Sequence, residues 1–560
     1  MDNYTIAKHF TFLSRLMEVH GLNSFKSKTY SIAAYKIEQL TVELQTLSKE
    51  KVFSINGIGD AIGSKIIELN ESGKMQALEE LILKTPEGIL EMMKIKGLGP
   101  KKIFIIWKEM EVENVGELLY ACHENRLSLM KGFGKKTQQN IIDSITFYQK
   151  QQGNYLYAQV EQLAIEIESL LHSIFDTGQI EITGAFARQS ETVEELEYVI
   201  ALPLKSIIDK ISTQPEFEII EDAEEYILYK YNDGIKIKIY TAEKNSFAWI
   251  CLETSGTQVF NERFNSYIKD AAPEFASVKS QEEIFKKAGL QFIPASLREN
   301  AAIINIASGS KLPDLIRTED IKGIIHCHSS WSDGSNTLEE LAKACVLKKY
   351  EYLVISDHSK AAYYAQGLSE DKIKAQHALV DELNDAMTPF KIFKSIESDI
   401  LNDGSLDYGD IILSTFDLVI ASVHSNLKMT EEKAMTRLLK AIENPYTTIL
   451  GHMTGRLLLS RKGYPIDHKK IIDACAAHDV VIEINAHPRR LDMAWQWLEY
   501  ALSKGILVSI DPDAHAIEEF GNTKYGVLVA QKGMVTAKNN LSSFSLSEFE
   551  KFLQNRKTKK

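Results

Sequence analysis

The second half of the chain alternates short apolar segments with stretches of helical periodicity, and every segment leads into a histidine or a carboxylate. The seven segments are GIIHCH (323–328), YLVISDH (352–358), FKIFKSIES (390–398), DLVIASVH (417–424), TTILGH (447–452), VVIEINAH (480–487) and ILVSIDPDAH (506–515). Alternating strand and helix units of this length predict a parallel barrel, in which the carboxyl ends of all strands meet at one mouth. The pattern therefore gathers chemically active side chains from distant parts of the chain around one point.

Nine side chains at these strand ends are candidate metal ligands. They are His326, His328, Asp333, His358, Glu397, His424, His452, Asp513 and His515. A single histidine after a strand is usually a structural residue, but the same placement in six of the seven segments indicates a shared site. Imidazole mixed with carboxylate suits Mn²⁺, Zn²⁺ or Fe²⁺ better than Ca²⁺ or Mg²⁺, and so many ligands predict a cluster of about two or three ions. His487, in the remaining segment, has no neighbouring ligand, which leaves open whether it binds a metal or supports a residue that does.

A metal cluster with open coordination positions activates water at neutral pH and neutralises both oxygens of an in-line phosphoryl displacement. The residues alone therefore predict phosphoester hydrolysis in this half of the chain.

The first 150 residues predict an all-helical region with a repeated glycine turn. The three turns contain Gly57 and Gly59, Gly97 and Gly99, and Gly132 and Gly134. Such a turn directs the backbone N–H groups of the following helix toward an anion, and its glycines let a phosphate backbone come close. Four lysines, here called the turn lysines, follow the second and third turns: Lys101, Lys102, Lys135 and Lys136. One turn alone is more often a helix connection, but three turns, two of them followed by lysines, predict contact with DNA phosphates.

Charge and cysteine usage limit the class of protein. Residues 1–150 carry 20 Lys and Arg against 18 Asp and Glu, whereas the other 410 residues carry 44 against 59. A near-neutral front and an acidic remainder fit a DNA-binding region joined to a metal-binding one. No apolar run reaches membrane-spanning length, and Lys8, His9 and Arg15 interrupt the start, so we expect no membrane partner and no signal peptide. The five cysteines form no CxxC pair, which suits a reducing compartment, and we expect a cytoplasmic protein. We also expect a monomer.

Residues 151 to 305 have a mixed pattern of strands and helices, with QIEITGAFA, EYVIALP, FEIIED and GIKIKIYTA predicted as strands. Glu195 and Glu197 stand two apart before an apolar run. Both would face the same way on a strand, so they could hold a cation at a nucleotide-transferring site. The alternative is a solvated acidic edge.

The motifs HCHSSWSDG, SDHS, SIESDILNDGSLDY, ASVHS, GHMTGRLL and DPDAH resemble those of the PHP (polymerase and histidinol phosphatase) domain. Nearly the whole chain resembles a bacterial family X DNA polymerase with a C-terminal PHP domain. The resemblance implies a distorted seven-stranded (β/α)7 barrel that holds a trinuclear cluster on the nine candidate ligands. It also implies a manganese-dependent 3′–5′ exonuclease that in some members cleaves at abasic sites.

The resemblance divides the multidomain chain into six parts. They are a helix-hairpin-helix lyase-like domain (1–80), a fingers-like domain with two helix-hairpin-helix turns (81–150), an α+β nucleotidyltransferase-like palm (151–242), a thumb-like subdomain (243–305), a linker (306–320) and the PHP domain (321–560).

The palm departs from the family pattern, which reads approximately Gly-Ser-x-Arg-Arg-Gly followed by an Asp-x-Asp pair. This chain has GAFARQ at 184–189, which keeps one arginine, Arg188, and lacks the hydroxyl and the second arginine that would handle a triphosphate. Glu195 and Glu197 replace the aspartates, and Lys238 stands at the third palm aspartate. An ammonium group repels the cations, and glutamate reaches one methylene further than aspartate, which disturbs a geometry of narrow tolerance. We therefore expect a degenerate polymerase site.

Five further positions follow from the resemblance. Lys65 falls where the family has its Schiff-base lysine, although a phosphate-contacting or merely solvated lysine is an equal alternative. Lys26 and Lys28 are candidates to hold a 5′-phosphate. Arg456 and Arg490 are candidate phosphate clamps beside the metals.

We expect a DNA-repair nuclease that binds gapped, nicked or 3′-ended DNA and trims 3′ ends. The rival interpretations are a gap-filling polymerase with rearranged carboxylates, a small-molecule phosphatase of the histidinol-phosphate type and a non-catalytic DNA scaffold. The glycine turns argue against the phosphatase, and the complete ligand set argues against the scaffold.

Overall fold

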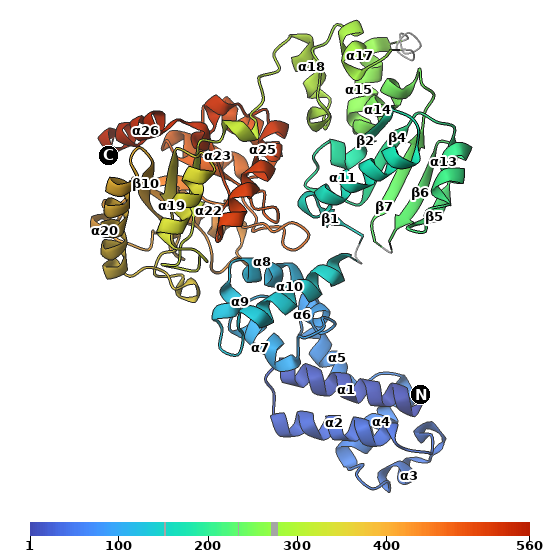
Figure 1. Ribbon diagram of the computed structural model, residues 1–560. Coiled ribbons are helices and arrows are strands. Elements are labelled where there is room, and N and C mark those ends of the chain that lie inside the picture. Colours follow the sequence, from blue (N-terminus) through green and yellow to red (C-terminus); the bar gives the residue numbers. More distant parts are fainter. Residues whose placement is uncertain (151–152, 233, 270–277, 560) are drawn as a thin grey trace. The chain divides into compact units, whose positions relative to one another are not determined.

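The computed structural model describes residues 1–150, 153–232, 234–269 and 278–559 (Figure 1). The chain divides into two compact units, one made of Met1–Cys122 with Phe133–Tyr148 and the other of His123–Gly132 with Gln149–Lys560. Within the described residues, no helix is both long enough and apolar enough to cross a membrane.

The first unit is helical, as the sequence predicts. Its helices are α1 (Asn3–Val19), α2 (Ser24–Glu38), α3 (Lys49–Phe53), α4 (Asp60–Ser72), α5 (Gln76–Leu83), α6 (Glu87–Met92), α7 (Pro100–Lys108), α8 (Val115–His123) and α10 (Lys135–Lys150), the last two of which extend into the second unit. Asp2 caps the start of helix α1, and its side chain accepts a hydrogen bond from the Thr5 N–H. Helix α1 lies against α2 (Figure 1), and its buried Phe10 packs against Tyr30 of α2 with 5.9 Å between the ring centroids.

The middle of the chain forms a five-stranded sheet in the order β2-β4-β7-β6-β5. Its strands are β2 (Ile180–Thr183), β4 (Glu195–Ile200), β5 (Phe217–Asp222), β6 (Tyr226–Tyr231) and β7 (Lys236–Thr241), and a short ladder joins β1 (Tyr155–Leu156) to β3 (Thr192–Val193). Strand β4 pairs with β7 in parallel, and the other neighbours are antiparallel. The sequence predicted β2, β4, β5 and β7 but not β6, which is buried along successive residues and so lacks the alternation typical of a half-exposed strand.

Helices pack around this sheet and form a second core after it. They are α11 (Tyr157–Ile174), α12 (Gly184–Ala187) and α13 (Leu204–Ile211), followed by α14 (Phe247–Ser255), α15 (Gln258–Ile268), α17 (Gln281–Lys287) and α18 (Ala302–Ser308). Phe260, Phe264 and Phe285 lie in the hydrophobic core that the last four helices form. This core is separate from the core of the sheet.

The C-terminal part is a nearly closed barrel of seven parallel strands, as the sequence predicts. The strands are β8 (Gly323–Cys327), β9 (Tyr352–Ile355), β10 (Lys391–Asp399), β11 (Leu418–Ser422), β12 (Thr447–Leu450), β13 (Val481–Asn485) and β14 (Val508–Asp511), and they neighbour one another in chain order. Backbone pairing between Cys327 and Ala514 brings the last strand back to the first, and the His328 N–H donates to the Ala514 carbonyl at 2.8 Å. The strands are buried on both faces, which explains why they appear in the sequence as continuous apolar runs.

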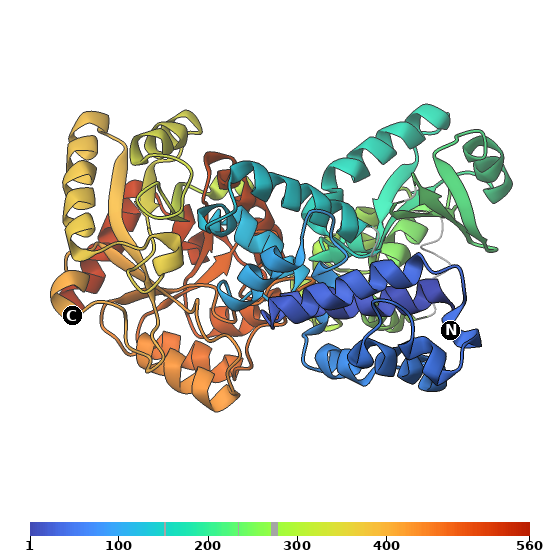
Figure 2. The ribbon, with the colours of Figure 1, turned by 90° about the horizontal axis from the view of Figure 1, so that it is seen from below.

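Helices surround the barrel in both views (Figures 1 and 2). They are α19 (Leu338–Leu347), α20 (Glu370–Met387), α21 (Asp410–Leu413), α22 (Glu431–Ile442), α23 (His468–Ala477), α24 (Leu498–Ser503), α25 (Thr523–Lys532) and α26 (Leu546–Lys559). Because every crossover helix lies outside, the carboxyl ends of the strands remain available for a site.

Candidate metal centre

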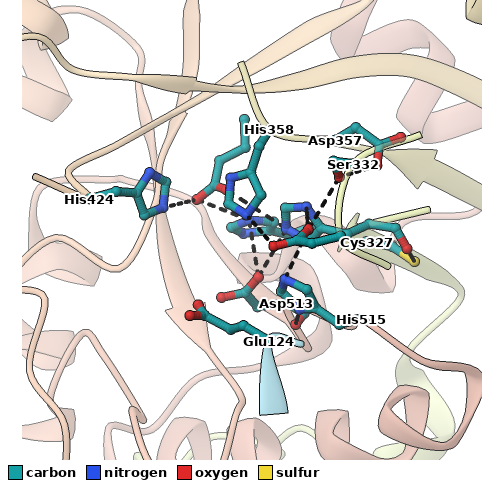
Figure 3. A network of polar contacts seen from close by, with 12 residues as sticks. Glu124, Cys327, Ser332, Asp357, His358, His424, Asp513 and His515 are labelled. Atoms are coloured by element: carbon teal, nitrogen blue, oxygen red, sulfur yellow. Dashed lines mark hydrogen bonds and ion pairs between the residues drawn. The ribbon is translucent and has the colours of Figure 1, made fainter. Parts of the chain in front are cut away.

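The carboxyl ends of the barrel strands bring the nine candidate ligands together in one cluster, in which all but the partly exposed His424 are buried. Eight of them form three groups, each with the geometry to hold one ion: His328, Asp333, His358 and His515; His326, His328 and Asp513; and His358, Glu397 and His424. The ninth, His452, lies with its Nε2 3.0 Å from Glu397 Oε1. Figure 3 shows side chains from opposite sides of the barrel directed toward this common centre.

Glu397, on β10, stands in the middle of the cluster. Its Oε1 lies 3.0 Å from His424 Nε2 and 3.3 Å from His326 Nε2, and its Oε2 lies 2.8 Å from His358 Nδ1. One carboxylate thus approaches imidazoles from three other strand ends, so Glu397 would be a ligand of any metal ion held there.

The donor atoms fit divalent metal ions. Buried atoms without a hydrogen-bond partner in the described part of the chain include His326 Nε2, His328 Nδ1, Asp333 Oδ2, Glu397 Oε2 and His515 Nε2. These atoms lie close to one another without the alignment of a hydrogen bond, which in a well-packed core calls for another partner. His326 and Asp513 also have φ angles of 57° and 52°, and such left-handed backbone at non-glycine residues clusters at functional sites.

Carboxylates of the cluster favour the charged form of the imidazoles beside them. Burial alone would lower the pKa of His515, but Asp333 and Asp513 outweigh it and raise that pKa to about 10. In the same way Glu397 and Asp399 outweigh burial and raise the pKa of His424 to about 9. A divalent ion that bound to these imidazoles would take the place of their protons.

Glu483, in the middle of strand β13, orients two of the ligands. Its Oε1 accepts a hydrogen bond from His326 Nδ1, which leaves His326 Nε2 directed into the cluster. Its Oε2 accepts the backbone N–H of His452 at 2.6 Å and the Asn485 amide at 3.4 Å. A carboxylate behind a ligating histidine fixes the ring tautomer and orientation.

Asp399 orients the ring of another candidate ligand, and Asp357 holds the loop of a further one. Asp399 Oδ1 lies 3.2 Å from His424 Nδ1. Asp357 accepts hydrogen bonds from the Ser329 N–H and hydroxyl and from the Ser332 hydroxyl, so it fixes the loop that carries Asp333.

Glu483, Asp399 and Asp357 were not among the residues predicted for the site. The available signal was an acidic residue inside an otherwise apolar strand for Glu483, and the Glu-x-Asp spacing for Asp399, which places both carboxylates of β10 on one face.

The two candidate phosphate clamps have different environments. Arg456 donates from Nη2 to Glu191 at 2.5 Å and from Nε to the Arg490 carbonyl at 3.0 Å, so it is engaged by the palm and by backbone. Arg490 Nε lies 3.9 Å from Oδ2 of Asp513. Of the two arginines, Arg490 is the one beside the candidate ligands.

His487 lies outside the three ligand groups. Its ring meets the ring of His123 edge to face, with 6.0 Å between the centroids. Burial and the neighbouring His123 hold the pKa of His487 well below its ordinary value.

The three glycine turns have the backbone that the sequence predicts. Gly57, Gly97 and Gly132 have φ angles of 90°, 89° and 91°, which other residues rarely adopt. No atom lies within 4 Å of where a side chain would stand at Gly97, so the turn is open to an approaching backbone. Three of the turn lysines are exposed, and the fourth, Lys102, is half-buried with its Nζ 3.3 Å from the Gly97 carbonyl.

The lysines predicted for the lyase-like domain remain predictions. Lys65 stands on α4 with its Nζ 5.9 Å from the centre of the Tyr30 ring. Lys26 and Lys28 stand on the exposed part of α2.

The palm carboxylates are satisfied by protein groups. Glu197 Oε1 accepts the Ala185 N–H at 3.2 Å, and Glu197 Oε2 accepts the Tyr240 hydroxyl at 3.0 Å. Lys238 Nζ lies 3.6 Å from Glu195 Oε1, so an ammonium group stands beside the first carboxylate.

The loop that keeps Arg188 contacts the barrel. The Arg188 carbonyl accepts a hydrogen bond from Lys532 Nζ of α25 at 2.7 Å. The Arg188 side chain faces Glu299, whose Oε1 also binds Lys532 at 2.5 Å. This loop is therefore part of an interdomain contact.

Comparison with known proteins identifies two helix-hairpin-helix regions and a relative that matches nearly the whole chain. Residues 1–75 match a family model described as a helix-hairpin-helix domain, and residues 89–146 match one described as a SAM-like helix-hairpin-helix tandem. The chain is 33% identical to the DNA polymerase/3′-5′ exonuclease PolX of Bacillus subtilis (strain 168), over 96% of this chain and 97% of that protein.

Shorter relatives are similar to parts of the chain. A probable phosphatase of Thermoanaerobacter sp. (strain X514) is 24% identical over 42% of this chain and 95% of its own length. A probable phosphatase of Shewanella frigidimarina (strain NCIMB 400) is 32% identical over 17% of this chain and 37% of its own length.

Proposed function

Because this chain belongs to the bacterial family X DNA polymerases that carry a C-terminal PHP domain, we propose that its barrel is a metal-dependent 3′–5′ exonuclease acting in DNA repair. The observation that carries the proposal is the buried cluster of nine imidazoles and carboxylates, arranged in groups able to hold metal ions. The same membership and the helix-hairpin-helix domains support DNA as the substrate, here gapped, nicked or 3′-ended.

Different residues of the barrel have different roles in the proposed phosphodiester hydrolysis. Two or three divalent ions on the nine ligands, with Mn²⁺ the best match to six imidazoles, would supply an activated water and neutralise the phosphate. Glu483 and Asp399 hold the rings of His326 and His424 in the tautomer that a ligand needs. Arg490, beside Asp513, supplies a further positive charge for a phosphate oxygen.

The first unit is proposed to hold the DNA. The open glycine turns and the turn lysines offer backbone N–H groups and ammonium groups to phosphates, without contacts that read a base sequence. Binding of this kind suits an enzyme that must act at any broken or gapped end.

We also propose that the polymerase activity is lost. Both oxygens of Glu197 are engaged by protein donors, and Lys238 neutralises Glu195, which leaves little electrostatic attraction for a pair of cations. The Arg188 loop, which would contact the triphosphate, is held against Lys532 and Glu299 instead.

The site of action is proposed to be the cytoplasm. The five cysteines are buried and form no disulfide, which is typical of proteins from a reducing compartment.

The experiment compares wild type with a His326→Ala, Glu397→Ala double variant on a 5′-labelled primer–template in Mn²⁺. Wild type should shorten the primer from its 3′ end, and the double variant should lose the activity by orders of magnitude because both lost groups serve one transition state. Circular dichroism and DNA affinity, both expected to change little, show that the variant is folded. A duplex with one abasic site, incubated in parallel, tests the endonuclease activity that some family members have.

A gap-filling polymerase is the second candidate, favoured by the intact five-stranded palm sheet. Primer extension with all four dNTPs in Mn²⁺ tests it, and robust incorporation by wild type would replace the proposal of a lost polymerase site.

A further inference from the structure

Glu124 is a buried acidic residue near the metal centre that has no role in the proposed hydrolysis. Glu124 comes from the segment His123–Gly132, which belongs to the same compact unit as the barrel. It is 7% exposed and lies beside Asp513 and His515 (Figure 3).

Three contacts fasten this segment to the barrel on either side of Glu124. The ring of His123 packs edge to face on His487. The Asn125 amide donates to the Asp333 carbonyl at 3.3 Å and to the Ser335 hydroxyl at 3.0 Å, which ties it to the loop of a candidate ligand. The position of Glu124 is therefore set by its neighbours in sequence.

Arg126 lies over an aromatic ring. Its guanidinium carbon lies 4.3 Å from the centre of the Tyr364 ring, and its Nε is buried with no hydrogen-bond partner among the described residues. The cation–π contact holds the guanidinium in place, and the buried Nε–H could still donate to an anion.

The carboxylate of Glu124 lies between two guanidinium groups. Oε2 is 3.4 Å from Arg126 Nη1, and Oε1 is 3.8 Å from Arg490 Nη2. Both distances exceed the 2.7–2.9 Å or so of a charge-assisted hydrogen bond, so the carboxylate is loosely held. One oxygen faces each arginine, as the two non-bridging oxygens of a phosphodiester would.

We propose that Arg126 and Arg490 form an anion site for a DNA phosphate beside the metal centre, and that Glu124 fills this site until the phosphate displaces it. The inference rests on the proposed nuclease function and adds Arg126 to its substrate-binding residues. The ligand class is a phosphate monoester or diester of a nucleotide.

The long contacts of Glu124 give the expected size of the effect. Because neither distance is that of a charge-assisted hydrogen bond, removing the competing carboxylate should tighten phosphate binding only modestly, about two- to fivefold.

The test is calorimetric titration of the full-length, Mn²⁺-loaded protein with dTMP, which needs no catalytic turnover. Glu124→Gln, which keeps the shape and removes the charge, should bind dTMP about two- to fivefold more tightly than wild type. Arg126→Gln should bind it more weakly. Glu382→Gln on α20, the same substitution at an exposed residue, controls for net charge and should match wild type.

A second variant separates occupation of the site from long-range repulsion. Glu124→Asp keeps the charge but withdraws the carboxylate by one methylene. If Glu124 competes by contact, this variant should lie between wild type and Glu124→Gln. If it matches wild type while Glu124→Gln binds more tightly, distant charge alone explains the effect and the proposal is refuted.

The same variants in the exonuclease assay separate this inference from the proposed function. A lower KM for Glu124→Gln supports the inference, and an unchanged or weaker dTMP affinity overturns it whatever the enzyme does. Tighter dTMP binding in a protein that never degrades DNA would leave the anion site standing and overturn the nuclease instead.

Discussion

Replacing Glu483 with glutamine should damage the metal centre through the loss of one acceptor oxygen. The carboxylate receives the His326 ring N–H on one oxygen and the His452 backbone N–H on the other. Glutamine has the same shape but only one acceptor oxygen, so its NH2 group must face one of these two donors. The residue is fully buried, and no water is expected to relieve the conflict.

The magnitude follows from the cost of an unsatisfied buried donor, about 1–3 kcal/mol. Since 1.4 kcal/mol is tenfold, Mn²⁺ affinity or kcat/KM should fall roughly tenfold to a hundredfold, as is common for groups that support metal ligands. Competition with a fluorescent chelator measures the affinity, and digestion of a labelled 3′ end measures kcat/KM.

Asp492→Asn is the matched control for Glu483→Gln. Asp492 is equally buried, but a single oxygen, Oδ2, accepts both the Thr454 N–H and its hydroxyl, at 2.9 and 2.8 Å. An asparagine carbonyl can accept both, so this variant should stay within about twofold of wild type. Equal losses of Mn²⁺ affinity or kcat/KM in both variants would mean that removing any buried charge has this effect. No loss in Glu483→Gln would refute the argument that both carboxylate oxygens must accept hydrogen bonds.

Three further predictions concern other parts of the chain. Changing the four turn lysines to alanine should weaken DNA binding equally for all sequences, as measured by fluorescence anisotropy. The slope of log affinity against log salt concentration should become shallower by about one unit per lost phosphate contact. An unchanged slope would mean that the turns are only structural connections. Lys238→Ala alone should give no primer extension, whereas aspartate at 195, 197 and 238 together should restore a measurable amount; extension by the single variant would contradict this. Burial lowers the pKa of His123 from 6.5 to about 4, so its neutral form contributes stability above pH 6.5 that is lost as the pH falls toward 4. His123→Gln should therefore flatten the decline of the melting temperature between pH 7 and pH 5, and an identical decline in both proteins would refute the assignment.

The barrel and the convergence of its candidate ligands could be predicted because both depend on local order. Each ligand directly follows its own apolar strand, and parallel strands connected by helices must present their carboxyl ends together. Because β8, β9 and β11 are buried along their whole length, each appears in the sequence as a continuous apolar run that is recognisable as a strand.

The residues that support the site could not be predicted in the same way because their partners are distant in the chain. Glu483 meets His326 across 157 residues, and Asn125 meets Ser335 across 210. These contacts depend on closure of the barrel and on where the segment His123–Gly132 lies, and no sequence spacing encodes either.

The five-stranded sheet has both a feature that the sequence predicts and one that it does not. Glu195, Glu197 and Lys238 were visible in the sequence, and they predicted a weakened cation site. The hydrogen bonds that Glu197 accepts from Ala185 and Tyr240 were not visible, because they require the register of β4 against β7 and the turn at Gly184.

The most direct test is the fate of a 5′-labelled primer annealed to a template, incubated with protein, Mn²⁺ and all four dNTPs. A nuclease with a lost polymerase site should shorten the primer despite the nucleotides, EDTA should stop the shortening, and the His326→Ala, Glu397→Ala variant should leave the primer intact. Lengthening of the primer by wild type, or shortening at the normal rate by the double variant, would contradict the proposed function.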